Sequence, residues 1–306
     1  MTRKMKSDIA ASILQRLLNQ ARADKEDFNH LLNRYGIERF LYRLSISLYN
    51  EEFVLKGASL FLAWQEQNYR VTKDADFLSF GDPYLDSLSE IFKEICQIKC
   101  PEDGISFLPE SVKAQAIREE QAYDGVRISL TGSLNKARVS LQIDVGFGDI
   151  VTPSPEMIDY PSLLDFPKPK LRAYSRYSVI AEKVEAMVKL GIANSRMKDF
   201  YDVWLLSKLH EFEYKILEQA LENTFRRRET NFPDKPPLAL TADFYEDTQK
   251  QQQWKAFIRK SKIRETPEDL TSLIDDLSTF ILPIFKQKLE KDNHCIWIPG
   301  KGWAEN

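Results

Sequence analysis

Cysteine, histidine and glycine are scarce in this 306-residue chain, which has three cysteines, three histidines and 11 glycines. The cysteines and histidines are too few and too scattered for a disulfide framework or for the usual spacing of zinc ligands. The low glycine content, together with 14 prolines, excludes collagen-like and low-complexity classes. What remains is ordinary globular composition, with 43% hydrophobic and 29% charged residues. Chain length adds an expectation of a sizeable core and about two domains.

Long hydrophobic runs are also missing. Gln15 and Arg16 interrupt the most apolar N-terminal stretch, residues 9–18, which is therefore too polar for a transmembrane helix or a secretory signal. We expect no membrane association and a cytoplasmic location.

Charge of one sign is not in excess, since 43 basic and 46 acidic residues give a net charge of -3. This balance argues against a protein that coats nucleic acid indiscriminately. Residues 166–200, however, carry eight basic side chains against three acidic ones, a local charge of +5. A polyanion such as RNA could bind there, although a solvated helical surface explains the charge about equally well. The candidate RNA-binding residues are Lys168, Lys170, Arg172, Arg176, Arg196 and Lys198.

The hydrophobic periodicity predicts an α+β region followed by a mostly helical one. Helices are expected over residues 7–49, 58–67 and 85–99, and strands over 53–55, 74–80, 126–130 and 138–147, the last two as an antiparallel pair. Five prolines between residues 153 and 169 mark a boundary or a wrapping loop. Beyond it, helices are expected over 178–193, 197–209, 214–224, 244–260 and 270–291. The chain is thus divided into N-terminal helices (1–49), a sheet domain (50–165) and a helical domain (166–306).

A glycine turn lies where a predicted strand gives way to a helix, in the sequence Lys56-Gly57-Ala58-Ser59. Backbone N–H groups at such a turn can converge on an anion, and glycine lets the chain approach closely. The turn is a candidate phosphate-binding site, although turns of this kind more often serve only as helix caps.

Three aspartates follow on two predicted strands. Asp74 and Asp76 are two residues apart, so in an extended chain they lie on one face roughly 7 Å apart and would repel each other without a cation between them. Asp144 is in a strictly alternating strand and points away from its apolar side. Solvated aspartates are the simpler explanation for each one alone. As a group they suit divalent-metal ligands.

Together these elements resemble the nucleotidyltransferase fold of the DNA polymerase β type, a mixed sheet flanked by helices. That superfamily has a glycine turn, then Asp-hydrophobic-Asp-hydrophobic, then a third carboxylate between hydrophobic residues. Here Ala58 stands where a second glycine or serine is usual. More narrowly, residues 53–60, 70–77, 181–186 and 196–203 look like the four motifs of the AbiEii/MenT nucleotidyltransferase toxins.

The resemblance implies a Mg²⁺-dependent nucleotidyltransferase that uses an NTP as substrate. Asp74 and Asp76 would be metal ligands, with Asp144 completing a two-metal site, and Lys183 would be the essential lysine. Asp199 or Asp202 would complete the site. The family further implies a cognate antitoxin protein, a role in abortive phage infection and the addition of nucleotides to tRNA 3′ ends.

Helix geometry supports Lys183 independently. At 100° per residue, Lys183 falls about 300° from Ile180, within the apolar arc, whereas Glu182, Glu185 and Lys189 gather on a polar arc. A buried ammonium group needs an anion, so we expect a phosphate or a carboxylate nearby. A lysine whose stem covers the edge of the apolar stripe is the alternative. Asp199 and Asp202 share one face of the next helix and need partners as well, which Arg196 or Lys198 could provide.

Two other functions remain open. The same fold could transfer a nucleotide to an aminoglycoside-like small molecule or to a protein hydroxyl, which would need no basic RNA surface. It could also be a non-catalytic binding module, with residues such as Arg226, Arg227 and Arg228 forming a partner surface. Modification of Thr72, two residues before Asp74, could place a phosphate against the metal ligands and silence the site.

Overall fold

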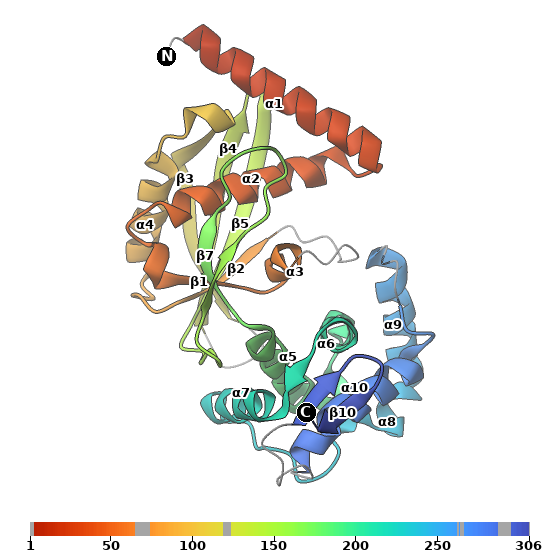
Figure 1. Cartoon of the computed structure of the whole chain (residues 1–306). Coiled ribbons are helices and arrows are strands. Elements are labelled where there is room, and N and C mark those ends of the chain that lie inside the picture. The colour runs from red at the N-terminus through yellow and green to blue at the C-terminus, as the bar shows by residue number, and fades with distance from the viewer. Residues whose placement is uncertain are drawn as a thin grey trace. The chain divides into compact units, whose positions relative to one another are not determined.

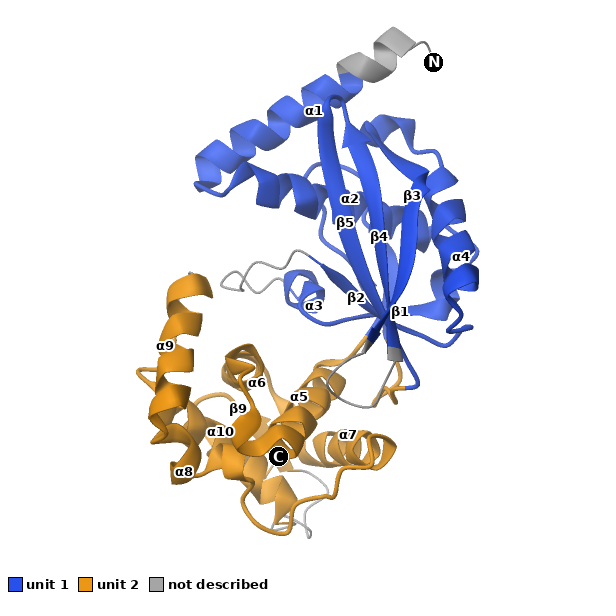
Figure 2. Cartoon of the chain, turned by 180° about the vertical axis from the view of Figure 1, so that it is seen from behind, with its two compact units in different colours: residues 1–148, 156–173 blue, residues 149–155, 174–306 orange. Residues whose placement is uncertain are grey.

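The structure of the chain, a computed structural model, describes residues 3–64, 74–118, 124–261, 263, 266–286 and 295–305. It contains two compact units, coloured separately in Figure 2, and each is described by itself. Unit 1 comprises Met1–Gly148 and Glu156–Ala173, and unit 2 comprises Asp149–Pro155 and Tyr174–Asn306. The chain therefore passes from one unit to the other three times, all within the proline-rich stretch and its flanks.

Unit 1 begins with the predicted helices. They are α1 (Arg3–Asp24), α2 (Phe28–Ser45), α3 (Ser59–Ala63) and α4 (Leu85–Gln97), with short 3₁₀ helices η1 (Asn50–Glu52) and η2 (Pro101–Asp103). The Asp27 side chain caps α2 by accepting a hydrogen bond from the backbone N–H of His30 at 3.1 Å, which satisfies one of the free amides of the first turn.

The sheet of unit 1 is mixed, as expected for the polymerase β type (Figure 1). Its strands are β1 (Phe53–Lys56), β2 (Ala75–Ser79), β3 (Ile105–Arg118), β4 (Asp124–Leu134), β5 (Ala137–Phe147), β6 (Glu156–Asp159) and β7 (Lys170–Ala173). They lie in the order β3-β4-β5-β2-β1-β7-β6. Strand β2 runs parallel to β5, and β1 parallel to β7, whereas the other neighbours are antiparallel. The predicted pairing of β4 with β5 is confirmed.

Helix α2 packs on one face of this sheet. A Cβ added to Gly36 of α2 would lie 2.5 Å from a methyl group of Val139, so glycine permits the close approach. The residues of β5 that alternate with Val139 on this side, from Leu141 to Val145, are buried. Gln142 and Asp144 therefore point to the opposite face, as the sequence pattern predicts.

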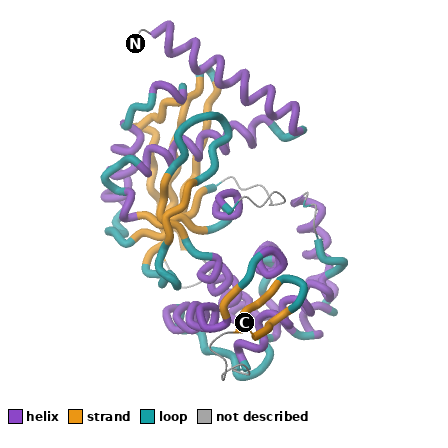
Figure 3. Tube along the Cα trace, in the orientation of Figure 1, coloured by secondary structure: helices purple, strands orange, loops and turns teal. Residues whose placement is uncertain are grey.

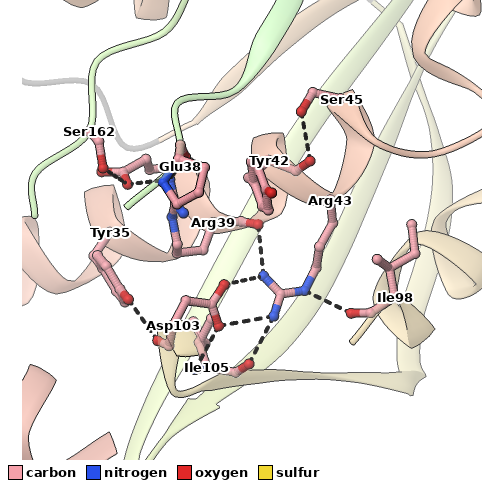
Figure 4. A network of polar contacts seen from close by, with 11 residues as sticks. Tyr35, Glu38, Arg39, Tyr42, Arg43, Ser45, Ile98, Asp103, Ile105 and Ser162 are labelled. Carbon is pink, nitrogen blue, oxygen red and sulfur yellow. Dashed lines mark hydrogen bonds and ion pairs between the residues drawn. The ribbon is translucent and has the colours of Figure 1, made fainter. Parts of the chain in front are cut away.

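A buried network of charges fixes α2 within unit 1 (Figure 4). Arg43 donates to both carboxylate oxygens of Asp103, at 2.7 and 3.1 Å, and to three backbone carbonyls, so its donors are fully used. Burial raises the pKa of Asp103 and the Arg43 bonds oppose that rise. Arg39 and Glu38 form a second buried pair at 2.7 Å. These contacts hold the loops around α2 in place and leave no charge open to a ligand.

Unit 2 is mainly helical, as predicted (Figure 3). Its helices are α5 (Arg176–Leu190), α6 (Met197–Leu209), α7 (Tyr214–Arg227), α8 (Ala242–Tyr245), α9 (Thr248–Ser261) and α10 (Leu270–Phe285), with 3₁₀ helices η3 (Gly191–Ala193) and η4 (Leu238–Leu240). A small sheet of β8 (Phe212–Glu213), β9 (Cys295–Ile298) and β10 (Gly302–Glu305), in the order β10-β9-β8, was not predicted. In the parts of the chain that the structure describes, no helix is both long and apolar enough to span a membrane.

Candidate functional site

Four charged residues form a row across four neighbouring strands of unit 1. Lys56 on β1 is opposite Asp76 on β2, Asp76 is beside Asp144 on β5, and Asp144 is opposite Arg127 on β4. Residues in register on adjacent strands point to the same face of a sheet. The structure thus gathers a lysine, two aspartates and an arginine on the face opposite α2, and sequence analysis had identified all of them except Arg127.

The Gly57 turn lies directly against this row. Gly57 has a φ of 71°, and a Cβ added to it would lie 2.1 Å from Oδ2 of Asp76. The absence of a side chain therefore lets the Asp76 carboxylate rest on the turn. An added Cβ on Gly146 of β5 would lie 3.4 Å from Nζ of Lys56, an ordinary contact distance, so the Lys56 ammonium group lies over this glycine. Gly57 is therefore the position in this site where the absence of a side chain is required.

Ser59 has a positioning role rather than an open hydroxyl. Its side chain is fully buried, and Oγ donates to the backbone carbonyl of Asp74 at 3.2 Å. This bond ties the start of α3 to the residue just before β2. Helix α3 has five residues, fewer than predicted. Within the Lys56–Ser59 candidate site, the Ser59 hydroxyl is therefore used within the protein. Residues 65–73, which include Thr72 and the start of the second motif, lie outside the described residues.

Asp144 is held by Arg127 through two hydrogen bonds. Nε and Nη2 of Arg127 donate to Oδ1 and Oδ2 of Asp144 at 2.8 and 2.7 Å, the bidentate geometry that guanidinium and carboxylate groups favour. These bonds raise the pKa of Arg127, with smaller contributions from Asp74 and Asp76. All three carboxylates are thus within electrostatic reach of one guanidinium.

The donor groups fit a magnesium ion, but with fewer ligands than the sequence suggested. Among the described residues, no group of three or more acidic, histidine or cysteine side chains is arranged to hold a metal ion. Mg²⁺ needs only one or two protein carboxylates, because water and substrate phosphates supply its other ligands. Asp74 and Asp76, the latter against the Gly57 turn, supply that number of carboxylates. Both oxygens of Asp144 accept from Arg127.

In unit 2, Lys183 is the centre of a buried ion triad. Its Nζ lies 2.7 Å from Oδ1 of Asp199 and 2.8 Å from Oδ2 of Asp202. The exposed fractions of the three side chains are 16%, 8% and 0%. Burial by itself would lower the pKa of Lys183, but the two carboxylates outweigh it and raise that pKa. Lys183 thus has the carboxylate neighbours that were predicted from its position on the apolar side of the helix.

The two aspartates of the triad differ in surroundings. Burial opposes ionisation of Asp199, but Lys183, helped by Lys198 and Arg196, lowers its pKa. Asp202 is wholly enclosed and shares the same lysine. Arg196 and Lys198, proposed above as structural partners, are thus secondary to Lys183. Counted alone, the three side chains carry a net charge of −1, and Lys198 and Arg196 add positive charge beside Asp199.

The six candidate RNA-binding residues divide equally between the units. In unit 1, Lys168 and Lys170 are exposed, but Arg172 donates to the carbonyl of Glu51 at 2.7 Å and its guanidinium carbon lies 5.7 Å from the ring centroid of Phe80. In unit 2, Lys198 is exposed, and Arg176 and Arg196 are partly buried. The residues most available to a polyanion are therefore the three lysines.

A second buried cluster in unit 2 corrects two expectations. Arg228 binds Asp149 at 3.2 Å, Glu182 at 3.3 Å and Glu185 at 3.1 Å, and its side chain is only 10% exposed. Glu185, expected on a polar arc, is fully buried. Arg228, considered above as part of a partner surface, is instead an internal counter-ion that ties α5 to the end of α7.

The mixed sheet, with a glycine turn against an aspartate on adjacent strand ends, defines unit 1 as a nucleotidyltransferase-type fold. The profile of the family described as "Nucleotidyl transferase AbiEii toxin, Type IV TA system" matches residues 39–289. The chain therefore belongs to the AbiEii nucleotidyltransferase toxin family, and the resemblance stated from its motifs is confirmed. Membership makes the protein a nucleotidyltransferase of a toxin–antitoxin system, a class in which the toxin has an antitoxin partner.

Comparison with solved structures gives two similar Helicobacter pylori proteins. JHP933 is 16% identical, with a TM-score of 0.46, and the match covers 83% of this chain and 90% of that one. The second, described as a candidate nucleotidyltransferase, is 15% identical, with a TM-score of 0.44 and coverage of 86% and 96%. No curated protein matches the chain. The family assignment rests on the profile match.

Proposed function

We propose that this protein transfers a nucleoside monophosphate from an NTP to the 3′-terminal hydroxyl of tRNA, with Mg²⁺ as cofactor. The observation that carries the proposal is the row Lys56-Asp76-Asp144-Arg127, with the Asp76 carboxylate on the Gly57 turn. In the reaction, the acceptor oxygen forms a bond to the α-phosphorus and the bond from that phosphorus to the bridging oxygen breaks. Pyrophosphate leaves with the electron pair, and the acceptor proton passes to solvent.

The charge of the row supports the need for a divalent cation. Asp74, Asp76 and Asp144 against Lys56 and Arg127 leave a net charge of −1, which would repel a bare triphosphate. Bound by Asp74 and Asp76, Mg²⁺ would neutralise the phosphates and favour charge development on the leaving group. Lys56, over Gly146, supplies a positive charge beside those carboxylates. The turn backbone at Gly57 offers N–H groups for a phosphate oxygen.

The participation of Lys183, Asp199 and Asp202 follows from the family motifs. An ammonium held by two aspartates keeps its proton at every physiological pH, which suits a group that offsets phosphate charge and does not suit a general base. We therefore assign Lys183 an electrostatic role and the two aspartates the task of holding it.

The test is transfer of label from each α-³²P NTP in turn to total RNA in the presence of Mg²⁺. Asp76→Asn should lower transfer roughly 100-fold or more because it removes a metal ligand without changing shape. Asp86→Asn, an exposed aspartate on α4, is the matched control and should transfer like the wild type. Full transfer by the Asp76 variant would contradict the proposed chemistry.

The acceptor is tested separately with tRNA whose 3′-terminal diol has been oxidised by periodate. We expect no labelling of this tRNA and full labelling of the untreated one. Replacing Lys168 and Lys170 by Ala should weaken RNA binding and flatten its salt dependence, because phosphate contacts release counterions. Label found on protein or on a small molecule would refute the tRNA acceptor while leaving nucleotidyl transfer in place.

A further inference from the structure

Arg127 differs from the buried arginine of the same unit in how its donors are used. All the N–H donors of the Arg43 side chain bind Asp103 or one of three backbone carbonyls. The side chains of Arg43 and Asp103 are only 2% and 1% exposed. Arg127 uses only Nε and Nη2, and its side chain is 39% exposed. Within the described ranges, Nη1 of Arg127 has no hydrogen-bond acceptor.

The bound edge of this guanidinium is fixed from one strand. Asp144 accepts from Nε and Nη2, and the side-chain oxygen of Gln142, in the amide orientation that its surroundings favour, accepts from the same two nitrogens at 3.1 and 3.3 Å. Gln142 and Asp144 are two residues apart on β5 and so lie on one face. The arginine is thus held in one orientation by β5, on a side chain that is 39% exposed.

The exposed donors lie beside the proposed metal ligands. Asp76 is two strands from Arg127 in the same row, a spacing of roughly 10 Å between backbones that the long arginine side chain shortens. An NTP bound with its metal at Asp76 would bring phosphate oxygens into this region. A planar guanidinium is the side chain best suited to bind phosphate oxygens with paired hydrogen bonds.

We infer that Arg127 binds the phosphates of the NTP, and that Asp144 positions Arg127 instead of binding a second metal ion. The inference rests on the proposed function, because it assigns a residue to the same nucleotide site. It replaces the metal role that the sequence suggested for Asp144 with a positioning role. The site then holds the nucleotide through one metal at Asp74 and Asp76 and one arginine, with Lys56 at the other end of the row.

The experiment measures the affinity of the whole protein for a nonhydrolysable NTP analogue by calorimetry, in saturating Mg²⁺, and then the Mg²⁺ concentration that gives half-maximal binding. Arg127→Ala should weaken analogue binding roughly 10- to 100-fold, as expected for loss of charged hydrogen bonds, without changing the Mg²⁺ requirement. Arg127→Lys should recover only part of the affinity, because lysine keeps the positive charge but lacks the planar pair of N–H donors of the guanidinium. Arg138→Ala, at the far end of β5 and exposed, is the matched control and should bind like the wild type.

Asp144 is tested by a double-mutant cycle with the same readout. If Asp144 acts through Arg127, Asp144→Ala should weaken binding, and the double variant should bind no more weakly than Arg127→Ala alone. A merely structural pair would not give this coupling in ligand affinity. Circular dichroism melting curves of all variants show whether the fold is retained.

Three results would overturn the inference. Unchanged affinity in Arg127→Ala would exclude phosphate binding by this residue, and transfer by the wild type would then leave the proposed function intact. A raised Mg²⁺ requirement in Asp144→Ala, with Arg127→Ala normal, would make Asp144 a metal ligand. Absence of any Mg²⁺-dependent NTP binding by the wild type would remove both the inference and the proposed function.

Discussion

Replacement of Lys183 by Met provides a quantitative test of the buried triad of unit 2. The variant keeps the bulk of the side chain but removes the cation that two enclosed carboxylates, Asp199 and Asp202, share. Breaking a buried ion pair by removal of one partner costs about 3–5 kcal/mol. Because Asp202 is fully buried and Asp199 nearly so, we expect a loss of free energy of unfolding in this range at pH 8.

The dependence on pH provides a sharper signature. In the wild type, the lowered pKa of Asp199 contributes stability above its ordinary value of 3.8, which is lost as pH falls through the folded-state pKa. The raised pKa of Lys183 contributes stability below 10.5, lost only as pH rises through its folded-state value. Without Lys183, burial raises the pKa of Asp199, so the native state holds a proton that the unfolded state releases above about pH 4. The variant should therefore lose less stability at pH 5 than at pH 8.

The assay is urea unfolding followed by tryptophan fluorescence, which reports mainly on unit 2 because Trp204, Trp254, Trp297 and Trp303 are all in it. Lys189→Met is the control, since Lys189 is exposed on the same helix. Combining Lys183→Met with Asp199→Asn and Asp202→Asn should restore much of the loss at pH 8. Equal stability of wild type and Lys183→Met at both pH values would refute the reasoning.

Three further outcomes are expected. Gly57→Ala should abolish most nucleotidyl transfer because its Cβ would meet the Asp76 carboxylate. Gly300→Ala is the control, because Gly300 has a similar φ of 76° but nothing within 4 Å of an added Cβ. It should carry the same backbone strain of about 1–2 kcal/mol and transfer normally. Arg43→Ala should lower the free energy of unfolding by about 3–5 kcal/mol in urea titrations because Asp103 would be left buried without its cation; a loss below 1 kcal/mol would show that the pair is not stabilising. Removal of divalent ions with EDTA should abolish the rise in melting temperature that an NTP produces, and a persistent rise would contradict metal-dependent binding.

Much of unit 1 could be predicted from periodicity, but strands β3 and β7 could not. The long strand β3 was missed because Pro109 and several polar residues interrupt its pattern and its pairing with β4 shifts register between Leu108 and Lys113. Edge strands tolerate such irregularities since one side of the backbone needs no partner. Strand β7 was missed because it begins directly after Pro169, the last proline of the proline-rich stretch, where a loop was the simpler interpretation.

In the candidate site, residues in contiguous motifs could be predicted from the sequence, whereas a residue defined by strand pairing was missed. Asp76 and Gly57 were found because their motif is contiguous, whereas Arg127 became significant only through strand register. The sequence did contain a usable signal for it. With a two-residue turn at Asn135 and Lys136, the hairpin pairs residues whose numbers sum to 271, and this places Arg127 opposite Asp144.

Helix α5 illustrates the limit of a helical wheel. The wheel correctly identified Lys183 as an unusual charge, but it assigned Glu185 to a solvated arc. Glu185 is buried because Arg228, 43 residues later, supplies its counter-ion. A wheel describes one helix and carries no information about a distant cation, so a buried acidic residue of this kind cannot be recognised without the tertiary structure.

The discontinuous course of the chain has a practical consequence for dissecting the protein. Segment Asp149–Pro155 is secured to unit 2 by Thr152 and Asp149, and the chain then returns to unit 1 to supply β6 and β7. A fragment ending at Gly148 would lack β7 and would expose the hydrogen-bonding edge of β1, the strand that leads into the Gly57 turn. Neither half can be obtained intact as a simple truncation, and separate expression would require grafting or circular permutation.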